Sequence, residues 1–145
     1  MNLKELKELW ETDCSIDDNH LGEEATKTPK LHSKYINILI DTKQLLVKTK
    51  ADFDTIKRLK ARYYKGELTR EELTEYGWEQ YQYAKPLKTE LEEILAADED
   101  VIRQSAKVEY LQIMIYFLES VMTQIKSRDF QLKNGIQWRV FISGG

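Results

Sequence analysis

The sequence predicts an all-α protein in which two long helices pack as a coiled-coil-like hairpin with short flanking helices. Gly and Pro, which interrupt helices, number only six and two among 145 residues, and helix-forming residues dominate the rest. Apolar residues also recur at alternating spacings of three and four along two long segments, as in a helix seam. Because a chain of this length is usually one domain, we expect a single helical domain over residues 1–145.

The N-terminal third predicts a short helix, a connecting segment and the start of a long helix. The first helix is expected over about residues 3–11, where four apolar side chains share one side: Leu3, Leu6, Leu9 and Trp10. The polar stretch after it has turn formers and no period, which indicates a linker or an ordered loop. Thr28 and Pro29 then have the pattern of a helix cap followed by a first-turn proline.

The first long helix is expected to run from this cap to Gly66, which can take the left-handed conformation beyond a helix end. Its seam is interrupted by three polar residues, Thr42, Thr49 and Lys60. The apolar members of the seam are Leu31, Tyr35, Ile38, Leu45, Phe53, Ile56 and Tyr63.

Two short helices are expected before the second long one. Thr69 and Glu72 have the spacing of a capping box, so a helix should follow to about Tyr76. An aromatic stretch punctuated by Gly77 and Pro86 comes next, and a helical segment is expected over residues 87–97.

Carboxylates at residues 98–100 stand where the positive end of the second long helix is expected. This helix is predicted to end near Phe130, because Asn134 and Gly135 interrupt the pattern. Its apolar arc is wider than one partner helix needs, with a seam and an adjacent stripe. The second face could meet another subunit or the short helices of the same chain. The seam comprises Val101, Val108, Leu111, Ile115, Leu118, Met122 and Ile125, and the stripe Tyr110, Met114, Phe117 and Val121.

The C-terminal tail alternates apolar and polar residues, which is the period of a strand, although a short helix or an extended arm remains open. A free apolar tail favours aggregation, so we expect it to be buried against a neighbouring subunit. Repetition of one head-to-tail contact closes a ring. The predicted oligomerisation residues are Leu111, Ile115, Phe117, Leu118, Val121, Ile136, Trp138, Val140, Phe141 and Ile142.

Positive charge is concentrated in one part of a chain whose net charge is −3. Residues 43–65 carry eight Lys or Arg against two Asp, a local net charge of +6. On a helix these residues share the side opposite the seam, with Tyr64 at the edge and Lys60 toward the seam. Such a row can neutralise the phosphates of a single strand while an aromatic ring stacks on a base. The predicted nucleic-acid-binding residues are Lys43, Lys50, Lys57, Arg58, Lys60, Arg62, Tyr64 and Lys65.

Other classes of function have little support in the sequence. There is no glycine-rich phosphate loop and no nucleophile elbow, so we expect no enzymatic activity and no cofactor. His20 beside Asp17 and Asp18 lies in turn-forming sequence, and no metal site is predicted. No apolar run approaches the roughly 20 residues of a membrane span, so a cytoplasmic protein is expected.

Three sequence blocks resemble the UvsY recombination mediator proteins of T-even-like bacteriophages. They are LKARYY at 59–64, LAADEDV at 95–101 and IKSRDFQLK at 125–133, and they occur in the family's order. The resemblance implies a protein of the infected bacterial cytoplasm that binds single-stranded DNA and helps displace the phage single-stranded-DNA-binding protein. It also implies loading of the RecA-like recombinase UvsX and a heptameric ring assembled through the C-terminal part.

The resemblance assigns DNA binding most directly to Lys60, Ala61 and Arg62, which match the family's Lys-Ala-Arg motif. In the family pattern two residues separate this Arg from a Tyr pair, whereas Tyr63 and Tyr64 follow at once here. Two fewer residues turn a helix by about 200°. The two tyrosines are therefore expected to face another side of the helix than in the family pattern, which weakens a stacking role for them. We expect a DNA-binding part over residues 1–97 and a long helix with an assembly tail over 98–145. The alternative is a scaffolding coiled-coil protein without a nucleic-acid ligand.

Overall fold

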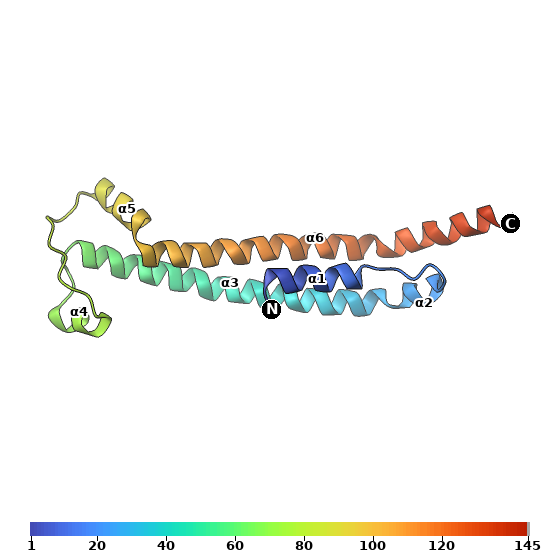
Figure 1. Ribbon diagram of the computed structural model, residues 1–145, viewed down its shortest axis with the longest axis horizontal. Coiled ribbons are helices and arrows are strands. Elements are labelled where there is room, and N and C mark those ends of the chain that lie inside the picture. The colour runs from blue at the N-terminus through green and yellow to red at the C-terminus, as the bar shows by residue number, and fades with distance from the viewer. Residues whose placement is uncertain (145) are drawn as a thin grey trace. The chain divides into compact units, whose positions relative to one another are not determined.

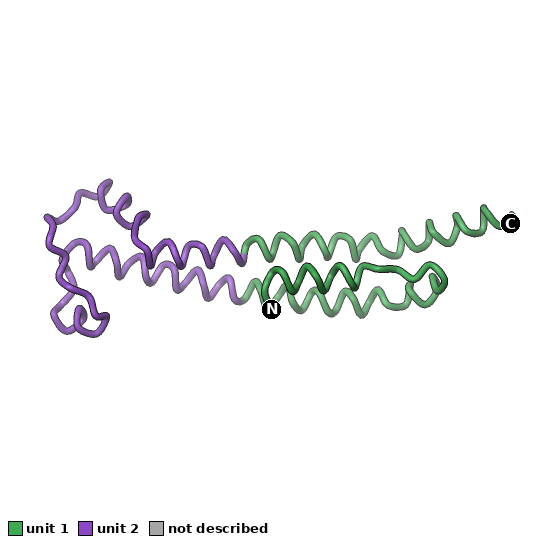
Figure 2. The backbone as a smooth tube through the Cα atoms, viewed as in Figure 1, with its two compact units in different colours: residues 1–44, 112–145 green, residues 45–111 purple. Residues whose placement is uncertain are grey.

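The computed structural model describes residues 1–144, and these contain six α-helices and no strand (Figure 1). Residues 1–44 and 112–145 form one compact unit, unit 1, and residues 45–111 form another, unit 2 (Figure 2). The two long helices each contribute to both units. The helices are α1 (Leu3–Asp13), α2 (Leu21–Thr26), α3 (Thr28–Tyr64), α4 (Arg70–Tyr76), α5 (Lys88–Ala97) and α6 (Glu99–Ile142).

The helix ends follow the local chemistry of the sequence. Asn2 and Thr69 cap α1 and α4, each in a capping box with the Glu three residues later. Gly77 ends α4 with a φ of 71°, a conformation that favours glycine. Asp98 caps α6, because its Oδ1 accepts hydrogen bonds from the backbone amides of Asp100 and Val101 at 2.9 and 3.1 Å.

Unit 1 buries the apolar faces of α1, α3 and α6. Leu6, Tyr35 and Leu118 have no exposed surface, and the ring of Trp10 lies edge-on to Tyr35 at 5.2 Å between centroids. The Tyr35 hydroxyl donates to Asp13 Oδ2 over 2.8 Å, which satisfies the polar end of a buried ring. Burial, followed by this hydrogen bond, raises the pKa of Tyr35.

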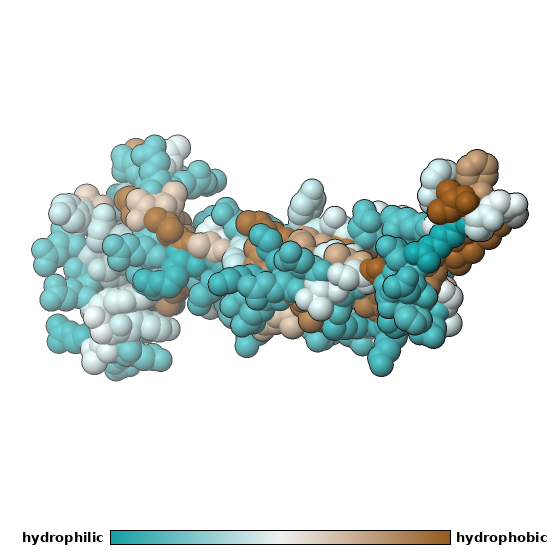
Figure 3. Space-filling view, turned by 45° about the vertical axis from the view of Figure 1, so that its right-hand side comes forward, coloured by the Kyte–Doolittle hydropathy of each residue, from teal (hydrophilic) through white to brown (hydrophobic). Residues whose placement is uncertain are grey.

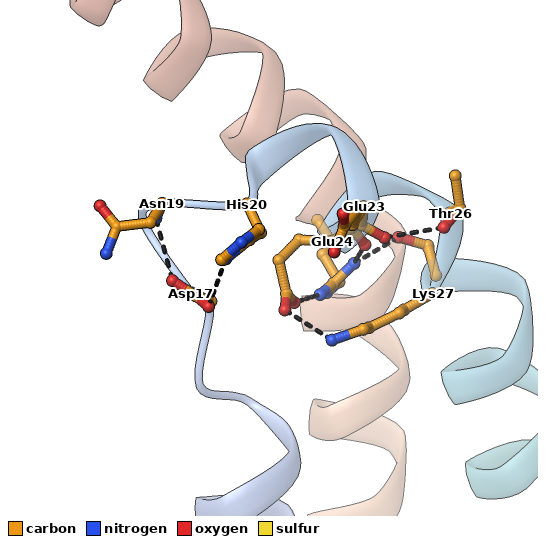
Figure 4. A network of polar contacts seen from close by, with 9 residues as sticks. Asp17, Asn19, His20, Glu23, Glu24, Thr26 and Lys27 are labelled. Carbon is orange, nitrogen blue, oxygen red and sulfur yellow. Dashed lines mark hydrogen bonds and ion pairs between the residues drawn. The ribbon is translucent and has the colours of Figure 1, made fainter.

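A buried ion pair fastens α2 to α6 within unit 1. Arg128 Nη2 lies 2.7 Å from Glu24 Oε2, and both side chains are 5% exposed. A second nitrogen of Arg128 donates to the backbone oxygen of Glu24 and to the hydroxyl of Thr28. Lys27 reaches the other oxygen of Glu24 at 2.8 Å (Figure 4). Removal of one partner would leave a buried charge without compensation.

The polar residues that interrupt the first seam are buried, as the pattern predicted. Thr42 in unit 1 and Thr49 in unit 2 are 7% and 8% exposed. Each hydroxyl donates to the carbonyl oxygen four residues earlier, at 2.7 and 2.8 Å, so neither is left unsatisfied.

Three sequence predictions are corrected by the structure. The segment after α1 contains the helix α2. Asn134 and Gly135 do not end the second long helix, which continues to Ile142, because one glycine inside a helix costs only about 1 kcal/mol relative to alanine. The tail is therefore helical rather than strand-like, and its alternating apolar residues are spread around the helix.

Within residues 1–144, every helix is too short or too polar to cross a membrane.

Candidate nucleic-acid interface

The exposed basic surface of unit 2 lies on the second half of α3. Lys50, Lys57 and Arg58 are exposed and Lys65 is half-buried, while Leu59 and Ile56 face inward. This matches the amphipathic arrangement that the sequence predicted for the helix. None of these four basic side chains forms an ion pair with a described carboxylate, so their charges remain available to a polyanion.

Lys60 lies apart from that surface, in a buried polar cluster at the ends of α3 and α6. The residue is 7% exposed, and its Nζ lies 2.9 Å from Asp100 Oδ2 and 3.2 Å from Asp98 Oδ2. The ammonium group also lies 4.1 Å from the centroid of the Trp78 ring, within cation–π range. A contact between Lys60 and DNA would require this side chain to leave two carboxylates and an aromatic face.

In this cluster, burial and polar contacts shift the pKa values of Lys60 and Asp98 in opposite directions. Burial alone would lower the pKa of Lys60, but its bonds to Asp100 and Asp98 outweigh burial and raise the pKa. Burial would raise the pKa of Asp98, but the Tyr64 hydroxyl, the Val101 amide and Lys60 outweigh it and hold the pKa below its ordinary value. Both groups are therefore held in their charged forms.

Two other predicted contacts already have acidic partners. Arg62 donates from both terminal nitrogens to the two carboxylate oxygens of Glu72 on α4, each at 3.1 Å, and this pairing lowers the pKa of Glu72. The Arg62 side chain is still 45% exposed, so a phosphate could compete for its guanidinium. In unit 1, Lys43 lies 3.5 Å from Glu119 across two exposed side chains, and such a surface pair is easily exchanged.

Tyr63 and Tyr64 belong to an aromatic cluster in unit 2. Tyr64 donates to Asp98 Oδ2 over 2.6 Å, and burial, followed by this bond, raises its pKa. Tyr63 donates to the backbone oxygen of Glu79 over 2.7 Å. Both rings are half-buried and contact Tyr81, with centroids 5.9 and 5.0 Å away. Other aromatic rings of the protein thus cover part of both rings, whereas Tyr83, which packs on Tyr81, is 78% exposed.

Sequence reasoning missed Lys85 and Lys88, which lie before and at the start of α5. Together with Lys57 and Lys65 of α3 they line a hollow of about 520 Å³ in unit 2, with Glu67 and Glu92 also in its walls. The sequence does place both lysines directly after the aromatic stretch, within five residues of Tyr83. Separation in sequence concealed the hollow, because only the packing of α5 on α3 brings these lysines together.

The predicted oligomerisation residues fall into two groups. Leu111, Leu118 and Val121 are buried within the chain itself and Ile115 and Phe117 are half-buried, so the chain's own helices cover this part of α6. After Leu132, by contrast, no described residue of α6 is buried. Figure 3 shows hydrophobic surface at this end of the chain. The exposed apolar side chains there are Phe130, Ile136, Trp138, Val140, Phe141 and Ile142.

The residues weighed as metal ligands form a surface turn. His20 Nδ1 lies 2.7 Å from Asp17 Oδ2 (Figure 4), and the backbone amide of Asn19, followed by His20, lowers the pKa of Asp17. Among residues 1–144, no three His, Cys, Asp or Glu side chains are grouped so that they could hold a metal ion.

Comparison with known proteins gives concordant matches. The family model described as "Recombination, repair and ssDNA binding protein UvsY" matches residues 9–145. The recombination protein uvsY of Enterobacteria phage T4 is 28% identical over 144 residues, which cover 99% of both chains. Crystal structures of the bacteriophage T4 recombination mediator protein UvsY superpose with TM-scores of 0.84 at 27% identity, covering 99% of both chains, and of 0.81 at 26% identity, covering 97% and 98%.

Proposed function

The chain belongs to the UvsY family of recombination, repair and single-stranded-DNA-binding proteins, and from this membership we propose that it is a phage recombination mediator. It binds single-stranded DNA, helps displace the single-stranded-DNA-binding protein of the phage, and loads a RecA-like recombinase of the UvsX type. These steps take place in the cytoplasm of the infected bacterium. The mediator needs no cofactor and no catalytic residue, because its work is done by differential binding to DNA and to protein partners.

The observation that supports DNA binding most strongly is the set of unpaired cations on α3. Lys50, Lys57, Arg58 and Lys65 present positive charge without an acidic partner. The phosphates of a single strand are neutralised by such a row with release of counterions. Arg62 and Lys43 can join when phosphates displace Glu72 and Glu119. For Lys60 we propose a supporting role, since its buried ion pairs hold the end of α3 beside α6.

We also propose that the last turns of α6 assemble the protein into a ring, with seven subunits as the resemblance implies. This segment exposes several large apolar side chains, and the rings of Trp138 and Phe141 stack on one another at 5.6 Å. Large apolar side chains that are exposed in such number at one end of a helix indicate a protein interface. A ring would place several basic surfaces on one strand, so that weak contacts add up to tight binding.

The mediator function is tested in a recombinase reaction. The recombinase is added to single-stranded DNA that is already coated with its binding protein, and ATP hydrolysis is followed in time. Addition of this protein should shorten the lag before hydrolysis. If the lag stays unchanged at every stoichiometry while each component is active alone, the result favours the alternative hypothesis of a scaffolding coiled-coil protein.

A further inference from the structure

The lysines that line the hollow between α3 and α5 in unit 2 have no acidic partners, unlike the basic residues of the predicted Lys-Ala-Arg motif. No described carboxylate lies within ion-pair distance of Lys57, Lys65, Lys85 or Lys88. Lys60 and Arg62, by contrast, are both paired to acidic side chains. A phosphate that enters the hollow meets free ammonium groups, whereas at Lys60 or Arg62 it must first displace a carboxylate.

The hollow has the charge that suits a nucleic-acid strand. Its four lysines are opposed by Glu67 and Glu92, so its walls keep a net positive charge. The remaining lining is apolar, from Pro86, Leu91 and Leu95. A phosphodiester backbone, which carries one charge per nucleotide, can therefore be neutralised there while its sugars contact the apolar wall.

Tyr83 supplies an aromatic face beside these lysines. Its side chain is 78% exposed, and its ring packs against Tyr81 with 5.4 Å between centroids. Tyr81 in turn contacts Tyr63 and Tyr64, so the exposed ring stands on a packed aromatic base. Tyr83 precedes Lys85 by two residues, which limits their Cα separation to about 7 Å. The backbone of Tyr83 therefore lies close to that of Lys85, within reach of a strand that is bound in the hollow.

We propose that residues 83–88 form a second wall of the path for single-stranded DNA, opposite the basic face of α3. Lys57, Lys65, Lys85 and Lys88 hold phosphates in the hollow, and Tyr83 stacks on an unpaired base. The ligand is a single strand, because the bases of a duplex are not free to stack on a side chain. This inference rests on the proposed function and adds the residues that complete its site.

The lysines are tested by charge removal at matched positions. Lys85→Gln with Lys88→Gln removes two charges from the hollow, and Lys4→Gln with Lys7→Gln removes two from exposed positions on α1. Anisotropy of a labelled oligothymidylate is measured from 0.05 to 0.5 M salt in steps of about twofold. For two lost phosphate contacts we expect the salt slope to fall by about 1.4 and binding at 0.1 M salt to weaken about 25-fold. The α1 variant should keep the wild-type slope.

Tyr83 is tested by substitutions that leave the charge unchanged. Tyr83→Ala should weaken binding about tenfold with the salt slope unchanged, because stacking contributes affinity without counterion release. Tyr83→Phe should bind as the wild type does. Tyr116 on α6 is 76% exposed, so Tyr116→Ala is the matched control and should have no effect on binding.

Each outcome of these titrations is informative. If the wild type binds while the Lys85/Lys88 and Lys4/Lys7 variants lose the same affinity, the hollow is not the path, and the proposed function stands without it. If Tyr83→Ala binds like Tyr83→Phe, the ring does not stack on a base and the second wall is refuted. A wild-type protein that binds no oligonucleotide refutes the proposed function and this inference together. Circular dichroism of each variant verifies that the helices are retained.

Discussion

Replacement of Lys60 by methionine should destabilise the protein strongly, although the sequence alone groups this residue with surface lysines. Methionine is an unbranched apolar side chain of similar length that lacks the ammonium group and its hydrogen-bond donors. Asp98 is then left 5% exposed without its cation. The loss of one partner of a buried pair costs about 3 to 5 kcal/mol. We expect Lys60→Met to lower the free energy of unfolding by about 3 kcal/mol, which is the lower end of this range. The reason is that Asp100 is 38% exposed, so water can solvate it.

The measurement is urea unfolding at pH 7 and fixed protein concentration, followed by tryptophan fluorescence and circular dichroism. With a slope of about 2 kcal/mol/M, the loss lowers the midpoint by about 1.5 M. Lys57→Met is the matched control, since Lys57 lies on the same helix and is exposed, and it should shift the midpoint little. A Lys60→Met midpoint equal to that of Lys57→Met would refute the burial argument.

Lys60→Met should also change the dependence of the free energy of unfolding on pH. In the wild type the folded-state pKa of Asp98 lies below its ordinary value. Its contribution to stability is thus present above the unfolded pKa of about 3.9 and is lost as the pH falls through the folded pKa. Removal of Lys60 takes away one of the causes that lower this pKa. The destabilisation caused by Lys60→Met should therefore become smaller as the pH falls toward the unfolded pKa of about 3.9, because protonation of Asp98 removes its unpaired charge. Urea unfolding of both proteins at neutral and at acidic pH measures this difference.

Three further predictions concern two glycines and the assembly of the C-terminal helix. Gly135→Ala should stabilise the protein by about 0.5 to 1 kcal/mol, because Gly135 lies inside α6 with no atom within 4 Å of an added Cβ. Gly77→Ala should destabilise it by about 1 kcal/mol, since Gly77 has a φ of +71°; thermal unfolding compares the two. Deletion of residues 135–145 should yield monomers or small oligomers with weakened DNA binding, and sedimentation that still shows a full-size ring would place the interface elsewhere on α6.

Local sequence signals were sufficient for most helix ends. The capping box at Thr69, the left-handed Gly66 and the cap at Asp98 each involve atoms within a few residues of one another. Such interactions depend on short spacings and little on the rest of the fold. The buried Thr42 and Thr49 were likewise predictable, because each hydroxyl is satisfied within its own helix.

The end of α6 was not predictable, because two weak local signals pointed to a stop that the longer helix overrides. Asn134 and Gly135 each lower helix propensity, but the helix is already formed before them, and each added residue of an existing helix gains a hydrogen bond without a new nucleation cost, so the helix continues to Ile142.

By itself the sequence determined an all-helical protein with two long amphipathic helices, a concentration of basic residues on the first, and the likeness to UvsY proteins. Helical periodicity and local charge depend on residues that are close in sequence, so they can be recognised without a structure. Only the tertiary structure decided which charges remain free. Lys60 is neutralised by Asp98 and Asp100 from α6, while Lys85 and Lys88 join Lys57 beside one hollow. Both results depend on the packing of residues that are distant in sequence. Such contacts cannot be predicted from the spacing of residues along the chain.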